Sequence, residues 1–320
     1  MSDIDFSKGG SPDDEPGGNG LVRQQGWTCD GAAELEVTID VGRIRVDLVP
    51  GGDEVRVEVR HDPASGGAFA QGVSGLISWI GSSGFAGPGF DADPEQLAKA
   101  AVRAAEISWS ESGRRLVVRS SEELPLRVVP LAVTVTAPAG SRVAARAGSG
   151  DVSVSGAAGW AAVRTGSGRV DMGAVDGDAD VTTGSGDIDL GPVAGRARVR
   201  TGSGGVRLAA VRGTTEVRAS SGDVTVTEVS ADLGVRTGSG EVLVHDARSG
   251  RIDLSTGSGD LRLAVHPGVA AELDLSSGSG RARSELDVGS VPPEGPTTLV
   301  IKGRTGSGDV VVTRAATVPA

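Results

Sequence analysis

A three-residue motif, Gly-Ser-Gly or Ser-Ser-Gly, recurs from residue 148 onward at nearly fixed spacing. From residue 148 to residue 238 each copy begins 18 residues after the one before it, and three later copies follow at longer intervals. A flexible glycine–serine linker has no reason to keep a fixed period, whereas proteins that stack one unit per coil require one. The interval therefore predicts a solenoid with coils of about 18 residues. The triplets begin at Gly148, Gly166, Gly184, Gly202, Ser220, Gly238, Gly257, Gly278 and Gly306.

Within each unit, apolar and polar residues alternate as they do in β-strands. Ile188 and Leu190 alternate with aspartates, and Ala197 and Val199 alternate with arginines. One unit cannot bury its apolar side chains alone, but units stacked at about 4.8 Å per coil bury a continuous core. The pattern predicts an all-β, single-chain parallel β-solenoid with a small helical insertion. The usual chirality of parallel crossovers predicts right-handed winding. A left-handed hexapeptide helix fits less well, because aliphatic residues do not recur at every sixth position.

The repeated triplet predicts a structural corner, because glycine permits positive φ angles and serine hydroxyls can bond to one another or to the corner backbone. A phosphate-binding loop needs a lysine that the triplets lack, and a calcium β-roll needs Gly-Gly-x-Gly-x-Asp in nine-residue repeats. Arg169 and Arg281 replace the acidic residue that follows other triplets, which argues against calcium. We expect the remaining acids, such as Asp187, to stay in solvent. The predicted structural column is Ser149, Ser167, Ser185, Ser203, Ser221, Ser239, Ser258, Ser279 and Ser307.

Arginines recur on the other side of the corner and form a second column. We expect them to pair with acids over the corner, Arg218 with Asp223 and Arg236 with Glu241, as exposed pairs that contribute little stability. A stripe that binds a polyanion is the alternative interpretation, and the interleaved acids count against it because they weaken the electric field. The column comprises Arg146, Arg164, Arg200, Arg218 and Arg236.

The segment "LAVTVTAPAGSRVAARAGSGDVSVSG" at 131–156, followed by repeated "RTGSG" corners, resembles a bacterial putative-adhesin family. The family is also called domain of unknown function 4097, and its members carry β-strand repeats. The resemblance covers roughly residues 34–60 and 116–314. It implies a β-solenoid fold and implies no activity, because the family has no established catalytic residues to carry over.

The chain upstream of the triplets divides into a tail and a set of irregular strands. Glycine, proline, aspartate and serine dominate the N-terminus and predict a disordered tail over residues 1–26. Alternating apolar residues then predict irregular β coils over 27–147, as expected for the atypical terminal units of a solenoid. The regular repeats follow over 148–320.

A helical insertion is expected at about 64–106, within the irregular coils. Residues 64–90 contain no charged side chain, and apolar residues from Phe69 to Ile80 recur on one helical face. A second helix is expected from Pro94 to about Ile107, with Asp93 as its N-cap. Three interpretations stay open: a cap over the rod, a surface for a partner protein or self-association, and a membrane-surface helix, which would favour basic residues. The predicted interaction surface is Phe69, Leu76, Ile77, Trp79, Ile80, Phe85 and Phe90.

Composition narrows the function classes further. The net charge of −11 argues against a nucleic-acid binder, and the single cysteine, Cys29, excludes an intrachain disulfide and a multi-cysteine metal site. No stretch has the roughly 18 apolar residues of a membrane helix, and the N-terminus lacks the pattern of a secretory signal. We therefore expect a cytoplasmic protein without an integral membrane segment, with a surface location as the alternative.

The residue types of catalysis are present but occur in no recognised arrangement. His61, His245 and His266 are the only histidines, and none has a metal-site or nucleophile spacing, although His245 and His266 fall near corners and could be close in space. The aspartates of 176–180 are expected on a flat, solvated strand. We predict no cofactor and no enzyme activity, and interpret the chain as a scaffold or protein-interaction module. The alternatives are a surface adhesin or envelope-associated stress sensor, and a polysaccharide-acting β-helix enzyme.

Overall fold

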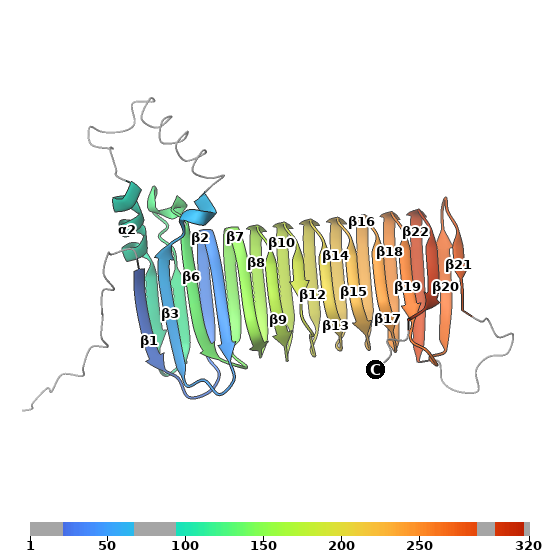
Figure 1. The fold of residues 1–320 in the computed structure, drawn as a ribbon, viewed down its shortest axis with the longest axis horizontal. Coiled ribbons are helices and arrows are strands. Elements are labelled where there is room, and N and C mark those ends of the chain that lie inside the picture. Colours follow the sequence, from blue (N-terminus) through green and yellow to red (C-terminus); the bar gives the residue numbers. More distant parts are fainter. Residues whose placement is uncertain (1–21, 67–93, 287–297, 317–320) are drawn as a thin grey trace, which may run out of the picture.

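The computed structural model describes residues 22–66, 94–286 and 298–316. These residues form one 23-stranded sheet that winds into an elongated rod (Figure 1). Each regular coil contributes one strand to each of two faces, and strands of successive coils pair in parallel, such as β10 (Ala179–Ser185) with β12 (Ala197–Ser203). The predicted all-β parallel solenoid is therefore confirmed, whereas its right-handed winding stays a prediction.

The face that we call face A contains the strands that end in the Gly-Ser-Gly triplets. Two long strands, β2 and β7, pass through both faces because they continue around the corner. In order along the rod, face A consists of β4 (Glu106–Ser110), β5 (Arg115–Arg119), β2 (Glu34–Val49), β7 (Arg142–Ala158), β8 (Trp160–Ser167), β10, β12, β14 (Thr215–Ser221), β16 (Leu233–Ser239), β18 (Gly250–Ser258), β22 (Leu299–Ser307) and β20 (Ala271–Ser277).

The opposite face, face B, contains the strands that follow the triplets. Its first three strands pair antiparallel, and the regular coils pair in parallel. In order along the rod, face B consists of β1 (Val22–Thr28), β3 (Glu54–His61), β6 (Leu131–Pro138), the second halves of β2 and β7, β9 (Val170–Val175), β11 (Ile188–Leu190), β13 (Val206–Val211), β15 (Val224–Val229), β17 (Val242–Ala247), β19 (Leu261–Val265), β23 (Val310–Arg314) and β21 (Ala282–Ser284).

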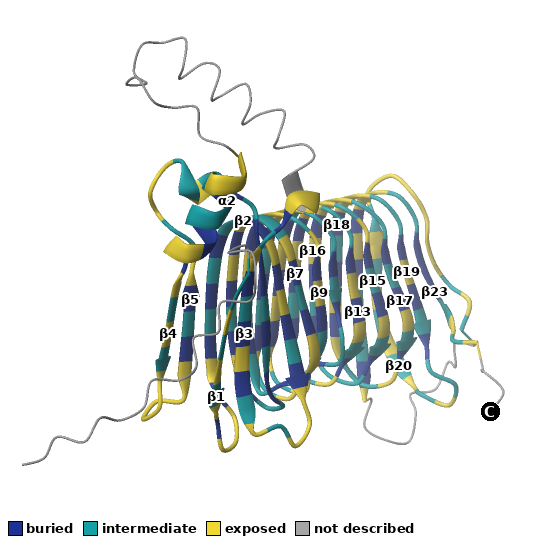
Figure 2. Cartoon of the chain, turned by 60° about the vertical axis from the view of Figure 1, so that its left-hand side comes forward, coloured by how far each residue is buried: buried dark blue, intermediate teal, exposed yellow. Residues whose placement is uncertain are grey.

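The core lies between the two faces and runs through every coil. Val181 pairs in register with Val163 and Val199, and all three side chains are fully buried. Ile188 fills the same role on face B, between Val170 and its later counterparts. Figure 2 shows the resulting alternation of buried and exposed residues along each strand. Because each buried valine or isoleucine contributes about 1.5–3 kcal/mol relative to an exposed one, stacking supplies the stability that a single coil lacks.

Both ends of the rod are interleaved rather than wound in sequence order. β2 lies between β7 and the later strands β5 and β6, and β22 lies between β18 and β20. The outermost strands are thus β1 and β4 at one end (Figure 2) and β20 and β21 at the other (Figure 1). Trp27 of β1 and Trp109 of β4 stack with ring centroids 5.7 Å apart, which joins the two faces at the first end.

Two boundaries differ from the sequence-based expectation. The chain is already a strand at Val22, inside the predicted tail of 1–26, because β1 pairs along its length with β3. Helix α2 (Pro94–Ala104) begins where expected but ends before Ile107, because β4 starts at Glu106 and pairs with β5. The buried face of α2 packs against β3 and against the short 3₁₀ helix η2 (Leu126–Val128); another, η1 (Pro63–Gly66), follows β3.

Candidate functional site

The corner serines are stacked in register, but they supply little of the hydrogen bonding there. Ser185 pairs with Ser167 and Ser203, and similar pairs run along the rod as far as Ser307. One hydroxyl pair is formed in the column, from Ser167 to Ser149 at 3.1 Å. In the terminal coil, the hydroxyl of Ser279 reaches a backbone carbonyl at 3.5 Å. The serines therefore line the outside of the corner.

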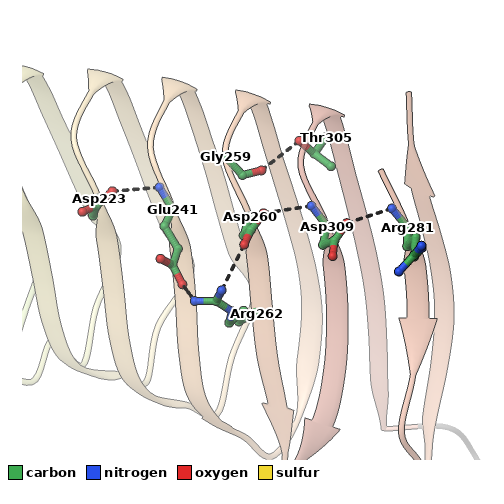
Figure 3. Close-up of polar contacts among 8 residues, drawn as sticks. All are labelled: Asp223, Glu241, Gly259, Asp260, Arg262, Arg281, Thr305 and Asp309. Carbon is green, nitrogen blue, oxygen red and sulfur yellow. Dashed lines mark hydrogen bonds and ion pairs between the residues drawn. The ribbon is translucent and has the colours of Figure 1, made fainter. Parts of the chain in front are cut away.

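A threonine stands two residues before six of the nine corner serines, and most of these threonines do more of the bonding. The hydroxyl of Thr165 donates to the carbonyl oxygens of Gly150 and Ser167 at 3.0 and 3.1 Å, and it is buried. Thr305 repeats this contact with Gly259 at 3.0 Å (Figure 3). Because each of these two threonines bonds to a corner carbonyl of the preceding coil, the hydroxyls fasten one coil to the next.

The corner aspartates are also structural acceptors, which corrects the expectation that they stay in solvent. Oδ1 of Asp187 accepts the backbone N–H of Gly205 in the next coil at 2.8 Å, and Asp223 accepts that of Glu241 at 2.8 Å (Figure 3). The reason is geometric: the corner N–H points toward the neighbouring coil, where a carboxylate can receive it. The same bond is made by Asp151, Asp260 and Asp309.

The expected ion pairs over the corner are not formed. Arg218 instead pairs with Glu216 of its own strand at 2.6 Å, because residues two apart project from the same side of a strand. Glu241 pairs with Arg262 on face B, which also reaches Asp260 at 3.0 Å (Figure 3). Among the described residues, the corner acids therefore form no ion pairs with the arginine column, whose member Arg218 is paired with Glu216 instead.

The two histidines near the corners line one groove on face B. The groove has a volume of about 830 Å³ and is lined by β17, β19 and the end of β23, including both His245 and His266. Nδ1 of His266 lies 2.9 Å from Oδ1 of Asp246, which also pairs with Arg248 at 2.8 Å. An irregularity in the register between β17 and β19 falls opposite Ala264, and such bulges re-aim side chains. The groove can hold a small polar ligand. The hydroxyls of Thr227 and Thr313 also line it, but neither forms a hydrogen bond with His266, so these described residues do not form a catalytic triad.

The other candidate residues contribute less. Cys29 is buried, and burial raises the pKa of its thiol, which makes it a poor nucleophile. Within the described ranges, no three His, Cys, Asp or Glu side chains gather closely enough to hold a metal ion. The predicted interaction surface from Phe69 to Phe90 lies outside the described residues, and stays a prediction.

The comparison with protein families decides the relationship. The family model described as Toastrack DUF4097 matches residues 131–313, more than half of the chain. The chain belongs to the Toastrack DUF4097 family. The match begins at β6 and ends in β23, so it covers all the regular coils of this Toastrack protein and their interleaved last end. No curated protein matches the chain.

Several solved structures resemble this Toastrack chain at low identity. A putative adhesin from Bacteroides fragilis is 10% identical, with a TM-score of 0.35 and coverage of 93% of this chain and 98% of that one. A putative adhesin from Parabacteroides merdae is 10% identical, with a TM-score of 0.30 and coverage of 91% and 97%. A putative cell adhesion protein from Clostridium sporogenes is 8% identical, with a TM-score of 0.23 and coverage of 92% and 99%. At these scores the likenesses carry no argument about function.

Proposed function

We propose that this Toastrack chain is a noncatalytic β-solenoid that serves as a rigid scaffold or protein-interaction module. The observation that supports the proposal is the use of the corner's polar groups. Hydroxyls such as that of Thr165 and carboxylates such as that of Asp187 bond to the backbone of neighbouring coils, so they fasten the rod together. The continuous core keeps the coils in register, and the two faces present side chains at a fixed spacing of about 4.8 Å.

The partner that we propose is another protein or a second copy of the chain, bound through residues 64–106. The described part of this segment is mainly α2, which buries Ala98, Ala101 and Val102 and leaves Glu95 and Arg103 exposed. The test replaces residues 67–93 with a short Gly-Ser linker and keeps α2. Proteins purified with the intact chain from its native host are then reconstituted with both forms. Loss of a reconstituted complex with an unchanged unfolding midpoint supports the proposal; retention of every complex contradicts it.

The alternative of a polysaccharide-acting enzyme rests on the groove with His266 and Asp246. A screen of purified protein against neutral and acidic polysaccharides, with release of reducing ends as the readout, tests it directly. We expect no release above that of a His266→Ala variant. Release that depends on His266 would replace the scaffold proposal with an enzymatic one.

The location of the protein is a separate part of the proposal. None of the described helices combines the length and hydrophobicity needed to cross a membrane. We propose that the protein is cytoplasmic, and the surface location suggested by the names of the similar structures is the alternative. Fractionation of the native host with an antibody to the rod decides between them, since recovery from the surface or the medium would contradict the cytoplasmic proposal.

A further inference from the structure

Face A carries a hollow where one coil lacks an outward side chain. Gly234 of β16 lies in register between Glu216 of β14 and Asp253 of β18. No heavy atom lies within 4 Å of the position that a Cβ on Gly234 would take. The resulting hollow has a volume of about 310 Å³, at the lower end of the range for small-molecule sites. A hollow of this size can hold one sugar ring, but it is too small for a group of side chains from a partner protein.

Charged groups of both signs line this hollow, and several are not used by the fold. Asp232 accepts the backbone N–H of Arg251 at 2.8 Å, and Glu216 is held by an arginine of its own strand. The side chains of Arg236, Arg251 and Asp253 also line the hollow, and they form no ion pair or hydrogen bond with another described residue. The hollow thus offers two guanidinium groups and one carboxylate to a ligand.

The hollow opens beside a row of arginines that runs along the rod. Arg200, Arg218 and Arg236 lie on successive strands, so their side chains stand about 4.8 Å apart, and like charges so placed destabilise a sheet. Glu216 is the carboxylate among them. A hydrogen bond from Arg218, and the fields of Arg236 and Arg200, hold the pKa of Glu216 below its usual value. The row comprises Arg146, Arg164, Arg200, Arg218, Arg236 and Arg304, all exposed.

The fold does not require arginine at these positions. Thr182 occupies the row between Arg164 and Arg200, and Ser255 occupies it after Arg236, in the same register. Small hydroxyl side chains therefore fit the row as well as arginine does. Arginines that repel one another and can be replaced without loss of fit are expected where they bind something.

We propose that the hollow and the arginine row bind a linear acidic polysaccharide, with one uronic-acid ring in the hollow and its neighbours along the row. Guanidinium groups match the planar carboxylates of such a chain. Asp253 accepts hydrogen bonds from sugar hydroxyls. A polyphosphate chain has no such hydroxyl donors. A nucleic acid is disfavoured, because no aromatic residue lines the hollow for base stacking. This inference does not rest on the scaffold function.

The test measures binding of the full chain to polygalacturonate, alginate and hyaluronate by calorimetry. Methyl-esterified pectin, which has the same backbone with neutralised carboxylates, and single-stranded DNA serve as comparison ligands. Arg200→Thr/Arg236→Thr removes two cations of the row, and Arg60→Thr/Arg283→Thr removes two from face B as the matched control. Each variant is first shown to keep the circular dichroism and unfolding midpoint of the parent chain.

A second pair of variants tests the hollow without changing charge. Gly234→Leu fills the hollow, and Ala162→Leu adds the same side chain elsewhere in that register row. We expect at least one polyuronate to bind, more weakly as salt rises. The double arginine variant should bind about tenfold more weakly, which corresponds to about 1.4 kcal/mol for the two lost charge contacts together. Gly234→Leu should also weaken binding, and both controls should bind as the parent does.

Three results would overturn the proposal. The first is that none of the polyuronates binds better than esterified pectin. The second is that the row and hollow variants bind as tightly as their controls. The third is that DNA binds more tightly than every polyuronate and loses affinity in the same variants, which would assign the row to nucleic acid.

Discussion

Replacing Asp187 with alanine removes the acceptor of the Gly205 N–H, which lies 2.8 Å from Oδ1. A hydrogen bond to a charged group contributes about 1.5–3 kcal/mol. The side chain of Asp187 is 42% exposed, so water replaces part of what is lost. We therefore expect the free energy of unfolding to fall by about 1 kcal/mol, and the melting temperature by about 2 °C for a chain of this size.

Amide hydrogen exchange gives the most direct assay of this change. The Gly205 N–H should exchange about fivefold faster in Asp187→Ala, since about 1 kcal/mol of local protection is lost. Asp187→Asn keeps an Oδ1 acceptor, so its Gly205 exchange rate should lie between those of the parent chain and Asp187→Ala. Asp171 is the matched control: it is an exposed strand aspartate of a nearby coil, and it accepts no hydrogen bond from another described residue. Asp171→Ala should leave both readouts within about 0.5 kcal/mol of the parent.

Two results would refute this reasoning. If Asp187→Ala and Asp171→Ala behave alike, the corner carboxylate is a solvated group, as sequence considerations alone suggest. If calcium raises the melting temperature of the parent and has no effect on Asp187→Ala, the carboxylate is a metal ligand. Neither result is expected, because Oδ1 is already occupied by the Gly205 N–H.

Three further predictions concern the corner and the first end of the rod, and the first two each have a matched control substitution. Gly186→Ala places a Cβ 2.1 Å from a carbonyl oxygen of the preceding coil and should cost about 4 kcal/mol or more, whereas Gly234→Ala, in open space, should leave the urea midpoint unchanged or raised. Thr165→Val removes a hydroxyl that donates to two carbonyls and should cost about 1 kcal/mol, whereas Thr183→Val removes a buried hydroxyl without a partner among the described residues and should be neutral or stabilising in the same assay. Hydrogen bonds from two arginines of β5 lower the pKa of Glu36 below 4.5, so its contribution is present above about pH 4.5 and is lost as pH falls through the lower folded-state pKa. The unfolding midpoint of the parent chain should fall as the pH drops below about 4.5, and this part of the fall should be missing in Glu36→Gln.

The repeat period predicts the regular part of the fold because each coil obeys the same local rules. The alternation around Val181 and Ile188 reports which side chains face the core, and the structure buries both. The interleaved end is different. Gly306 stacks on Gly257, and Gly278 stacks on Gly306, although Gly278 comes earlier in the chain. Corners of identical sequence are interchangeable in a stack, so local pattern cannot tell which copy lies next to which.

The role of the corner aspartates was missed for a related reason. Acid and other residues alternate along the column from Asp151 through Arg169, Asp187, Gly205 and Asp223. Relief of like-charge repulsion explains that alternation, and it leads to the prediction that the acids stay in solvent. The structure supplies the stronger reason: each aspartate serves the N–H of the next coil. The sequence signal that could have indicated this role is the recurrence of an aspartate in every second coil.

The arrangement of the rod also indicates where specific function can lie. A core position such as Val181 and a corner position such as Gly186 contact their copies in neighbouring coils, so a change at either disturbs the stack. Outward positions on the faces contact few such copies and are free to vary. A residue that differs from its counterparts in other coils is therefore a better indication of specific function at an outward position than any repeated corner residue is. Gly234, which stands in a register row with Asp180 and Glu216, is such a departure, and it creates the hollow beside the arginines.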